Sequence, residues 1–185
     1  PYTFIAFRAC SDTAPLSAKG GESRAFPRPL LLLLLLVFVF VCVDVLKNLY
    51  IPPHYAYDLN LGAATAMLTL SFTSWLEIPS ILAFGRLARK LSKWVILALS
   101  LLLAALYLAL NCLVQEATHA FALMGFYSVV WGSFSVSSSA LVAEITEVLG
   151  TGYGAYNMVF SLANIAAPTL ASAIMSAFGY DALLL

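Results

Sequence analysis

Long apolar stretches alternate with short polar connections along most of this chain. Five of these stretches have roughly the 20 residues that a helix needs to cross the hydrocarbon core of a membrane. They are residues 30–51, 63–84, 94–114, 120–143 and 156–179. Only Asp44, Lys47 and Glu77 carry charge inside them. The pattern therefore predicts five membrane-spanning helices.

The two ends of the chain are also apolar, but too short to span. The chain begins at Pro1 rather than at a methionine, and it stops inside the apolar run that closes at Leu185. We therefore expect a fragment in which residues 1–7 end a preceding transmembrane helix. Residues 8–29, which are rich in Ser, Gly, Pro and charge, have the composition of a flexible linker. Residues 30–185 would form a truncated transmembrane bundle.

Composition supports a membrane protein. Hydrophobic residues make up 62% of the 185 positions and charged residues only 10%, with a formal net charge of zero. Soluble domains are about 45–50% apolar and about 25% charged. Eighteen charged residues are too few to keep a chain of this length dissolved, so the composition argues against a soluble enzyme, a nucleic-acid binder and a disordered tail.

The basic residues are unevenly distributed. Eight of the nine Lys and Arg residues lie in segment 8–29 and in connection 86–93, whereas connections 52–62 and 115–119 contain none. Because cytoplasmic loops are enriched in Lys and Arg, both basic segments are expected in the cytoplasm. We expect a multi-pass protein of the plasma (cell inner) membrane, with linker 8–29 on the cytoplasmic side.

The second predicted span carries a polar face. Thr69, Thr73, Glu77 and Ser80 recur at spacings of four, four and three residues, so they share one side of a helix. A charge near the bilayer centre costs at least about 2.5–3.5 kcal/mol, and it is tolerated where it faces a cavity or a partner. Glu77 is therefore a candidate for proton coupling or solute binding. The alternative is a neutral or capped carboxyl in the helix interior.

The first span carries Asp44, Lys47 and Asn48 near its outer end. Asp44 and Lys47 are three residues apart and are expected to pair, and Asn48 lies one turn from Asp44 on a similar face. These groups either contact a polar solute or form an interfacial pair in which Lys47 reaches outward to the membrane surface.

Two further candidates for contact with a solute lie in the fourth and fifth spans. Trp131 lies near the middle of the fourth span, where it can stack on a sugar ring or an apolar drug, or simply face lipid or protein. The same span has a face of small residues, namely Gly125, Ser128, Gly132, Ser135 and Ser139, for which close helix packing is the commoner role. Asn164 is the best polar candidate in the fifth span.

The sequence contains no pattern typical of an enzyme. It has no Gly-rich phosphate loop, nucleophile elbow or paired catalytic carboxylates. The spacing of Cys10, Cys42 and Cys112 suggests neither a metal site nor a disulfide framework. We expect no cofactor, no metal ion and no nucleic-acid partner.

The order of these elements resembles the C-terminal half of a major facilitator superfamily transporter. Gly85-Arg86-Leu87-Ala88-Arg89-Lys90-Leu91-Ser92-Lys93 is similar to the basic cytoplasmic turn of that family, although Arg89 replaces the usual Asp and Ser92 the second Gly. Stretch 152–179 is similar to family span eleven. The resemblance implies an all-α helical bundle in which the five spans are spans seven to eleven, spans six and twelve are truncated, and an N-terminal half is missing.

A narrower resemblance is to the sugar efflux transporters of this superfamily. Tyr50-Ile51-Pro52, segment 58–62 and Leu76-Glu77-Ile78-Pro79 are similar to theirs in relative spacing. It implies secondary active efflux of sugars or related small polar solutes, driven by protons. The solute path would include Asp44, Asn48, Glu77, Trp131 and Asn164, with Glu77 as the proton acceptor. A multidrug exporter is the alternative within transport, and a non-transporting scaffold or receptor is the alternative outside it.

The cytoplasmic connections also suggest a gate. Glu144 and Glu147 follow the fourth span on the side where Arg86 and Arg89 lie. These residues are predicted to form an ion-pair latch in one conformation. Ordinary solvated interfacial charge is the alternative.

Overall fold

The computed structural model describes residues 27–178, and every regular element in that range is a helix. In chain order these elements are α2 (Arg28–Pro53), the π-helix η1 (His54–Asp58), α3 (Ala63–Leu87), α4 (Lys93–Asn111), α5 (Ala117–Ile145) and α6 (Leu149–Phe178). The predicted N-terminal helix end at 1–7 and nearly all of linker 8–29 lie outside the described residues.

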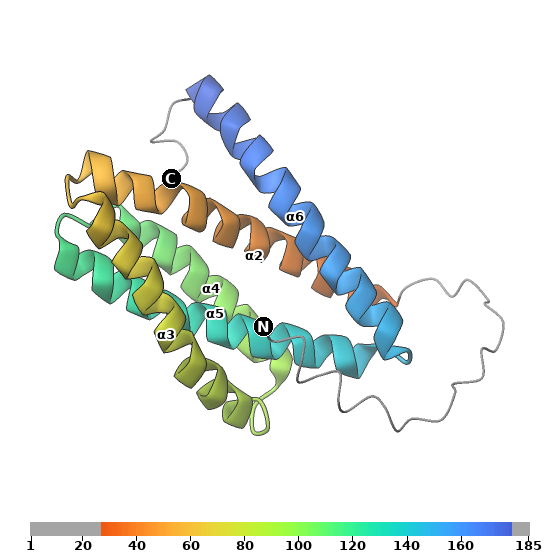
Figure 1. Cartoon of the computed structure of the whole chain (residues 1–185). Coiled ribbons are helices and arrows are strands. Elements are labelled where there is room, and N and C mark those ends of the chain that lie inside the picture. The colour runs from red at the N-terminus through yellow and green to blue at the C-terminus, as the bar shows by residue number, and fades with distance from the viewer. Residues whose placement is uncertain (1–26, 179–185) are drawn as a thin grey trace, which may run out of the picture.

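Helix α5 is the centre of the bundle. It packs along α3 and α4, and α2 packs along α6 (Figure 1). Helix α6 crosses α2 obliquely, so that the two are close where α6 begins and diverge toward its end (Figure 1). The interior between α2, α4 and α5 is aromatic: the rings of Phe40 and Phe134 stack with centroids 3.6 Å apart, and those of Tyr107 and Tyr127 lie 4.6 Å apart.

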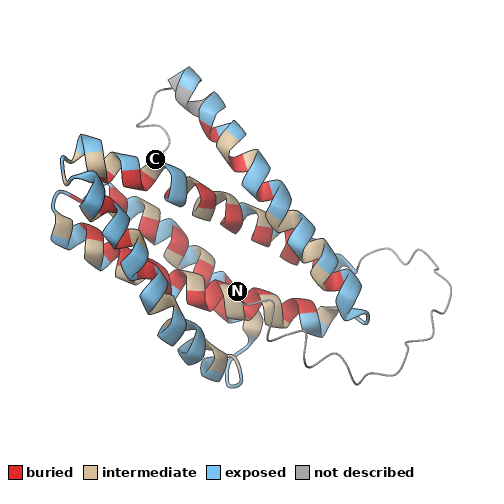
Figure 2. Cartoon of the chain, in the orientation of Figure 1, coloured by how far each residue is buried: buried red, intermediate tan, exposed pale blue. Residues whose placement is uncertain are grey.

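The helices have the length and apolarity that a membrane requires. Four of them, α2 with η1, α3, α4 and α5, are long and apolar enough to cross a bilayer within the described residues. The fifth predicted span lies in α6 except for Gly179, which is outside the described range. Exposed residues occur along the helices (pale blue in Figure 2). Several of them are large and apolar, notably Trp75 of α3 at 77% exposure and Ile165 of α6 at 70%. Such surfaces suit contact with lipid tails.

The connection after α2 contains more helix than its two prolines predict. We expected a loop over 52–62, but α2 includes Pro52 and Pro53 and passes directly into η1, so that only 59–62 connect to α3. The buried Tyr55 anchors this extension, because its hydroxyl donates a 2.8 Å hydrogen bond to Oδ1 of Asn111 in α4. Gly62, at φ 82°, then makes the turn into α3 in a conformation that favours glycine.

The connection between α5 and α6 is also shorter than predicted. We expected it to cover 144–155, but α5 continues to Ile145 and α6 begins at Leu149. The helix runs through Gly150, Gly152 and Gly154, which the apolar pattern alone excludes from a span. Gly152 allows this turn because a Cβ there would overlap the side chain of Thr146.

Small residues on α5 let α3 approach closely. A Cβ built on Gly132 would lie 2.8 Å from the Cβ of Ser80 and 3.1 Å from the backbone nitrogen of Ile81. Thr73 of α3 donates to the backbone oxygen of Met124 at 3.2 Å. The small-residue face therefore serves close helix packing here, as such faces do in other membrane proteins.

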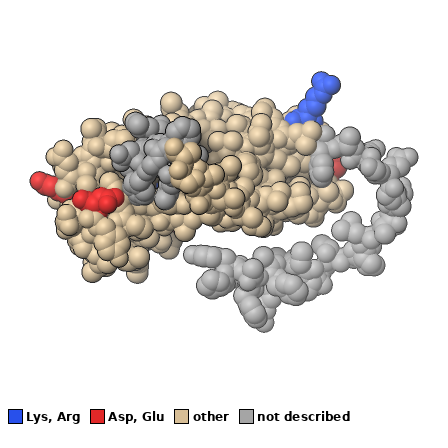
Figure 3. All heavy atoms as spheres, turned by 90° about the horizontal axis from the view of Figure 1, so that it is seen from above, with Lys and Arg blue, Asp and Glu red and all other residues tan. Residues whose placement is uncertain are grey.

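Charged side chains lie at the ends of the bundle on the face seen in Figure 3. Arg86 lies in the last turn of α3, Arg89 and Lys90 lie in the connection that follows, and α4 starts at Lys93. The opposite end carries Asp58 and Glu116 and has no Lys or Arg in its two connections. This separation is the arrangement from which we inferred the orientation in the membrane.

Candidate functional site

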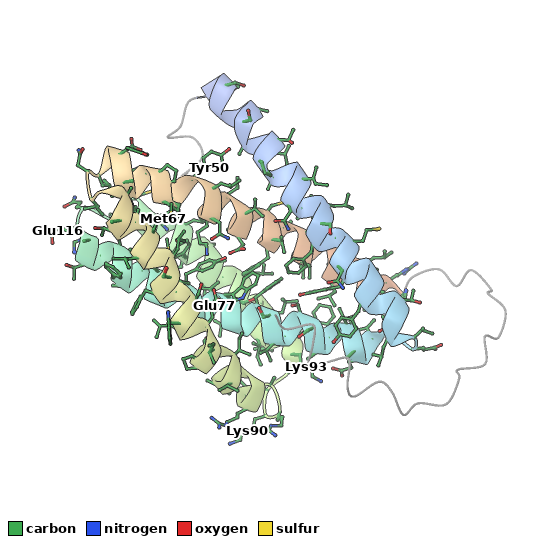
Figure 4. All side chains as sticks on the ribbon, viewed as in Figure 1. Tyr50, Met67, Glu77, Lys90, Lys93 and Glu116 are labelled. Atoms are coloured by element: carbon green, nitrogen blue, oxygen red, sulfur yellow. The ribbon has the colours of Figure 1, made fainter. Side chains whose placement is uncertain are left out.

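A polar cavity of about 270 Å³ lies between α2, α3 and α5. Glu77 lies about midway along the bundle (Figure 4). The cavity is lined by three residues of α2, four of α3 and one of α5: Asp44, Lys47, Asn48, Leu70, Thr73, Ser74, Glu77 and Trp131. Helical periodicity explains the grouping on α2 and α3, because each set recurs at spacings of three or four residues and so shares one face. The cavity thus gathers four of the five predicted path residues.

Asp44 has hydrogen-bond partners on both carboxylate oxygens. Its Oδ1 accepts a 2.7 Å hydrogen bond from the hydroxyl of Tyr127 on α5, and the ammonium of Lys47 lies 3.3 Å away. Its Oδ2 accepts a 3.1 Å hydrogen bond from the amide of Asn48. These contacts leave Asp44 little capacity for further donors, since a carboxylate accepts about four hydrogen bonds at most.

Lys47 points into the protein rather than toward the membrane surface. Its side chain is only 4% exposed, and its ammonium lies 3.8 Å from the centre of the Tyr127 ring. A cation in this position is attracted to the negative face of the ring. The alternative in which Lys47 reaches outward is therefore wrong for this structure: Asp44 and Tyr127 stabilise the ammonium inside the bundle.

Glu77 differs from Asp44 in having a free carboxylate. The side chain is half-buried and lines the cavity, and the described residues give it neither a hydrogen bond nor an ion pair. The neighbouring hydroxyls donate to backbone oxygens instead. Thr73 shares its one hydroxyl proton between Thr69 at 3.0 Å and Met124 at 3.2 Å, and Ser74 donates to Leu70 at 3.3 Å. The charge of Lys47 acts on Glu77 from the same cavity. Glu77 is thus the carboxylate that a solute or a proton can reach.

Trp131 provides the aromatic wall of the cavity. Its ring is partly exposed, and it packs against Phe40 and Phe134 with centroid distances of 6.0 Å to each. The stacked pair behind it holds the indole in place. One part of the ring therefore faces the cavity while the rest belongs to the core.

Asn164 lies apart from the other predicted path residues. It is exposed on α6, does not line the cavity, and donates a 2.8 Å hydrogen bond to the backbone oxygen of Phe160 in its own helix. Helix α6 buries its alanine face instead, and Ala163, Ala167 and Ala171 are each at most 1% exposed. The sequence does not indicate which of these two faces of α6 is buried, because the face with Asn164 and the alanine face both have helical periodicity.

At the basic end, the ion pair of Glu144 is with Lys93. The Lys93 ammonium lies 2.6 Å from Oε2 of Glu144 and joins the start of α4 to the end of α5. Arg86 and Arg89 are exposed in the neighbouring turn. Their pairing with Glu144 stays a prediction, and nothing in the sequence favours Lys93 over the other three basic residues between positions 86 and 93.

Comparison with known proteins identifies the family. The model of the Major Facilitator Superfamily matches residues 15–185, which is most of the chain. The chain belongs to the major facilitator superfamily. The predicted all-α membrane bundle is confirmed by this match and by the helices, and both support a multi-pass membrane transporter of small-molecule solutes. No curated protein matches it.

Tyr127 and Lys47 are the residues that the sequence underrated. The pattern alone predicts Lys47 as a partner of Asp44 or as a group reaching the membrane surface, and it predicts no specific role for Tyr127. The usable signal was the four-residue spacing of Tyr127 and Trp131, which puts both on one face of α5. What the spacing could not show is that this face of α5 meets Asp44 of α2, 83 positions earlier in the chain.

Proposed function

We propose that this transporter is a proton-coupled exporter of sugars or related small polar solutes, and that the chain is the C-terminal half of its bundle. The unpartnered Glu77 carboxylate in a polar cavity carries the proposal. The order of the helices, with the basic turn between α3 and α4, supports the assignment to the second half. The cavity would be part of the solute path, and linker 8–29 would be cytoplasmic.

The walls of the cavity suit a sugar. Sugars present hydroxyl groups that both donate and accept, together with apolar ring faces that stack on aromatic side chains. Lys47, Asn48 and Glu77 supply polar contacts, and Trp131 supplies the aromatic surface. The cavity of about 270 Å³ would be only one wall of the path, so its polar lining rather than its volume favours a small polar solute over a multidrug substrate.

Glu77 is the proposed proton acceptor. In an apolar membrane interior a carboxylate without a partner is costly, so binding a proton or a solute there is favourable. Alternating between these two occupants would couple proton entry to solute exit. Asn164 does not line this cavity, so it would contact the solute only where the path passes the exposed face of α6.

A flux assay tests this function. Proteoliposomes containing the full-length transporter and an imposed proton gradient should move labelled monosaccharides, and unlabelled sugars should compete while lipophilic cations do not. Competition by the cations and not by sugars would favour the multidrug exporter instead. Absence of any flux of either class would favour a non-transporting scaffold or receptor.

We also propose that the cytoplasmic charges act as a latch. Exposed ion pairs contribute about 0.2–1 kcal/mol, so loss of the Lys93–Glu144 pair should change transport rates only about 1.5- to 5-fold. Lys93→Glu and Glu144→Lys should each change the rate in initial-flux measurements, and the combined swap should restore it.

The same measurement distinguishes the partners of Glu144. Exchange of charge between Arg86 and Glu144 tests the pairing predicted from the sequence. Restoration by that swap and not by the Lys93 swap would assign the latch to Arg86. If neither double swap restored the transport rate lost in the corresponding single variants, these residues would be ordinary solvated charges.

A further inference from the structure

The Asp44 carboxylate is organised by other side chains rather than left open to a solute. Tyr127 and Lys47 occupy Oδ1, and Asn48 occupies Oδ2. With three contacts already made, the carboxylate keeps about one acceptor position for a solute hydroxyl. Asp44 therefore fits the role of a residue that holds its neighbours in place.

Lys47, in contrast, keeps a free donor in the cavity. An ammonium has three N–H donors. One faces Asp44 at 3.3 Å and the ring face of Tyr127 lies at 3.8 Å, while the residue lines the cavity with Glu77. The described residues provide no acceptor for a third donor. Lys47 is therefore the positive group on α2 that an acceptor on a solute can reach.

Tyr127 fixes where that ammonium lies. Its ring is fully buried and contacts both the Lys47 ammonium, 3.8 Å from its centre, and the ring of Tyr107, 4.6 Å away between centroids. The Tyr107 hydroxyl in turn contacts Sδ of Met124 at 3.7 Å. The Tyr127 hydroxyl also holds Asp44, the partner of Lys47. One rigid side chain of α5 thus determines both contacts of Lys47. A group held in place before binding loses less entropy when the solute arrives.

We propose that Lys47 is a solute-binding residue, that Asp44 and Tyr127 are its positioning residues, and that Lys47 and Glu77 together select solutes with adjacent hydroxyl groups. One hydroxyl oxygen accepts from Lys47 while a neighbouring hydroxyl donates to Glu77. This inference rests on the proposed sugar transport and names the protein groups that would recognise the sugar.

The test is the KM for a monosaccharide in proteoliposomes of the full-length transporter. Lys47→Met combined with Asp44→Asn removes both members of the ion pair, so that neither partner is left as a buried charge without the other. We expect this variant to insert normally and to raise KM about tenfold, the effect of losing one hydrogen bond to a charged group. A wild-type KM in this variant would overturn the role of Lys47.

Tyr127→Phe tests positioning. It deletes the hydroxyl but keeps the ring, and it should raise KM several-fold with little change in the maximal rate. Added to the Lys47→Met/Asp44→Asn background, it should have no further effect on KM, since the ammonium that Tyr127 positions is gone. An equal additional rise in that background would show a merely structural role and overturn the positioning claim.

Tyr55→Phe is the matched control. It removes a hydroxyl from another fully buried tyrosine, whose 2.8 Å partner is Asn111 and which does not line the cavity. It should leave KM unchanged, and a rise equal to that of Tyr127→Phe would also contradict positioning. If the wild-type protein moves no sugar, the proposed function and this inference fall together. If it moves sugar while the variants keep its KM, only this inference fails.

Discussion

Glu77→Gln is expected to abolish proton-driven solute movement while leaving the protein inserted and folded. The amide has nearly the same size and can still accept a hydrogen bond, but it cannot bind and release a proton. Glu77 has no partner among the described residues, so the substitution leaves no ion-pair partner behind. Its effect should therefore fall on coupling rather than on stability.

Two flux measurements separate coupling from solute binding. Uphill movement driven by a pH gradient should fall to the background of empty vesicles. Exchange of labelled for unlabelled sugar across the membrane needs no net proton movement and should continue. Unchanged rates and unchanged pH dependence in the variant would remove Glu77 from the coupling step.

Glu116→Gln is the matched control for this substitution. Glu116 is exposed at the start of α5, at the end of the bundle far from the cavity (Figure 4). The same chemical change there should leave the pH-driven rate unaltered. A comparable loss in both variants would point to a general effect of removing acidic charge.

Gly132→Ala is expected to destabilise the bundle by about 1–3 kcal/mol, the usual cost of adding atoms to a tightly packed interior. The new Cβ would overlap Ser80 and press on the backbone of Ile81, both in α3. The sign of the change in the free energy of unfolding is informative, because a glycine-to-alanine substitution in a helix interior otherwise stabilises by about 0.8–1 kcal/mol. Thermal unfolding of the purified protein in detergent measures the change.

Gly154→Ala provides the contrast, because a Cβ at Gly154 in α6 has no atom within 4 Å. It should be neutral or stabilising, opposite in sign to Gly132→Ala. Ser80→Gly should recover part of the stability of the Gly132 variant, since it removes the overlapping atoms. Equal effects at the two glycines would contradict close packing of α3 on α5 at Gly132.

The order and type of the elements were readable from the sequence because they depend on local properties. An apolar stretch of about 20 residues predicts a spanning helix, and the bias of Lys and Arg between the connections predicts the orientation in the membrane. Spacings of three and four residues placed Thr73 with Glu77 and Asp44 with Lys47 on common faces, and the structure has them so. The helix ends were less predictable: Pro52 and Pro53 indicated a loop, yet packing of Tyr55 on α4 continues the helix.

By itself, the sequence thus determined an all-helical membrane transporter and the rows of polar residues along its helices. Only the tertiary structure decided which rows meet. It brings Tyr127 to Asp44, turns Lys47 inward, leaves Glu77 open and directs Asn164 away from the cavity. The reason is physical: helical periodicity sets which residues share a face, but the rotation of each helix about its axis depends on how all of its neighbours pack. Contacts such as Gly132 against Ser80 set that rotation, and they join positions far apart in the chain.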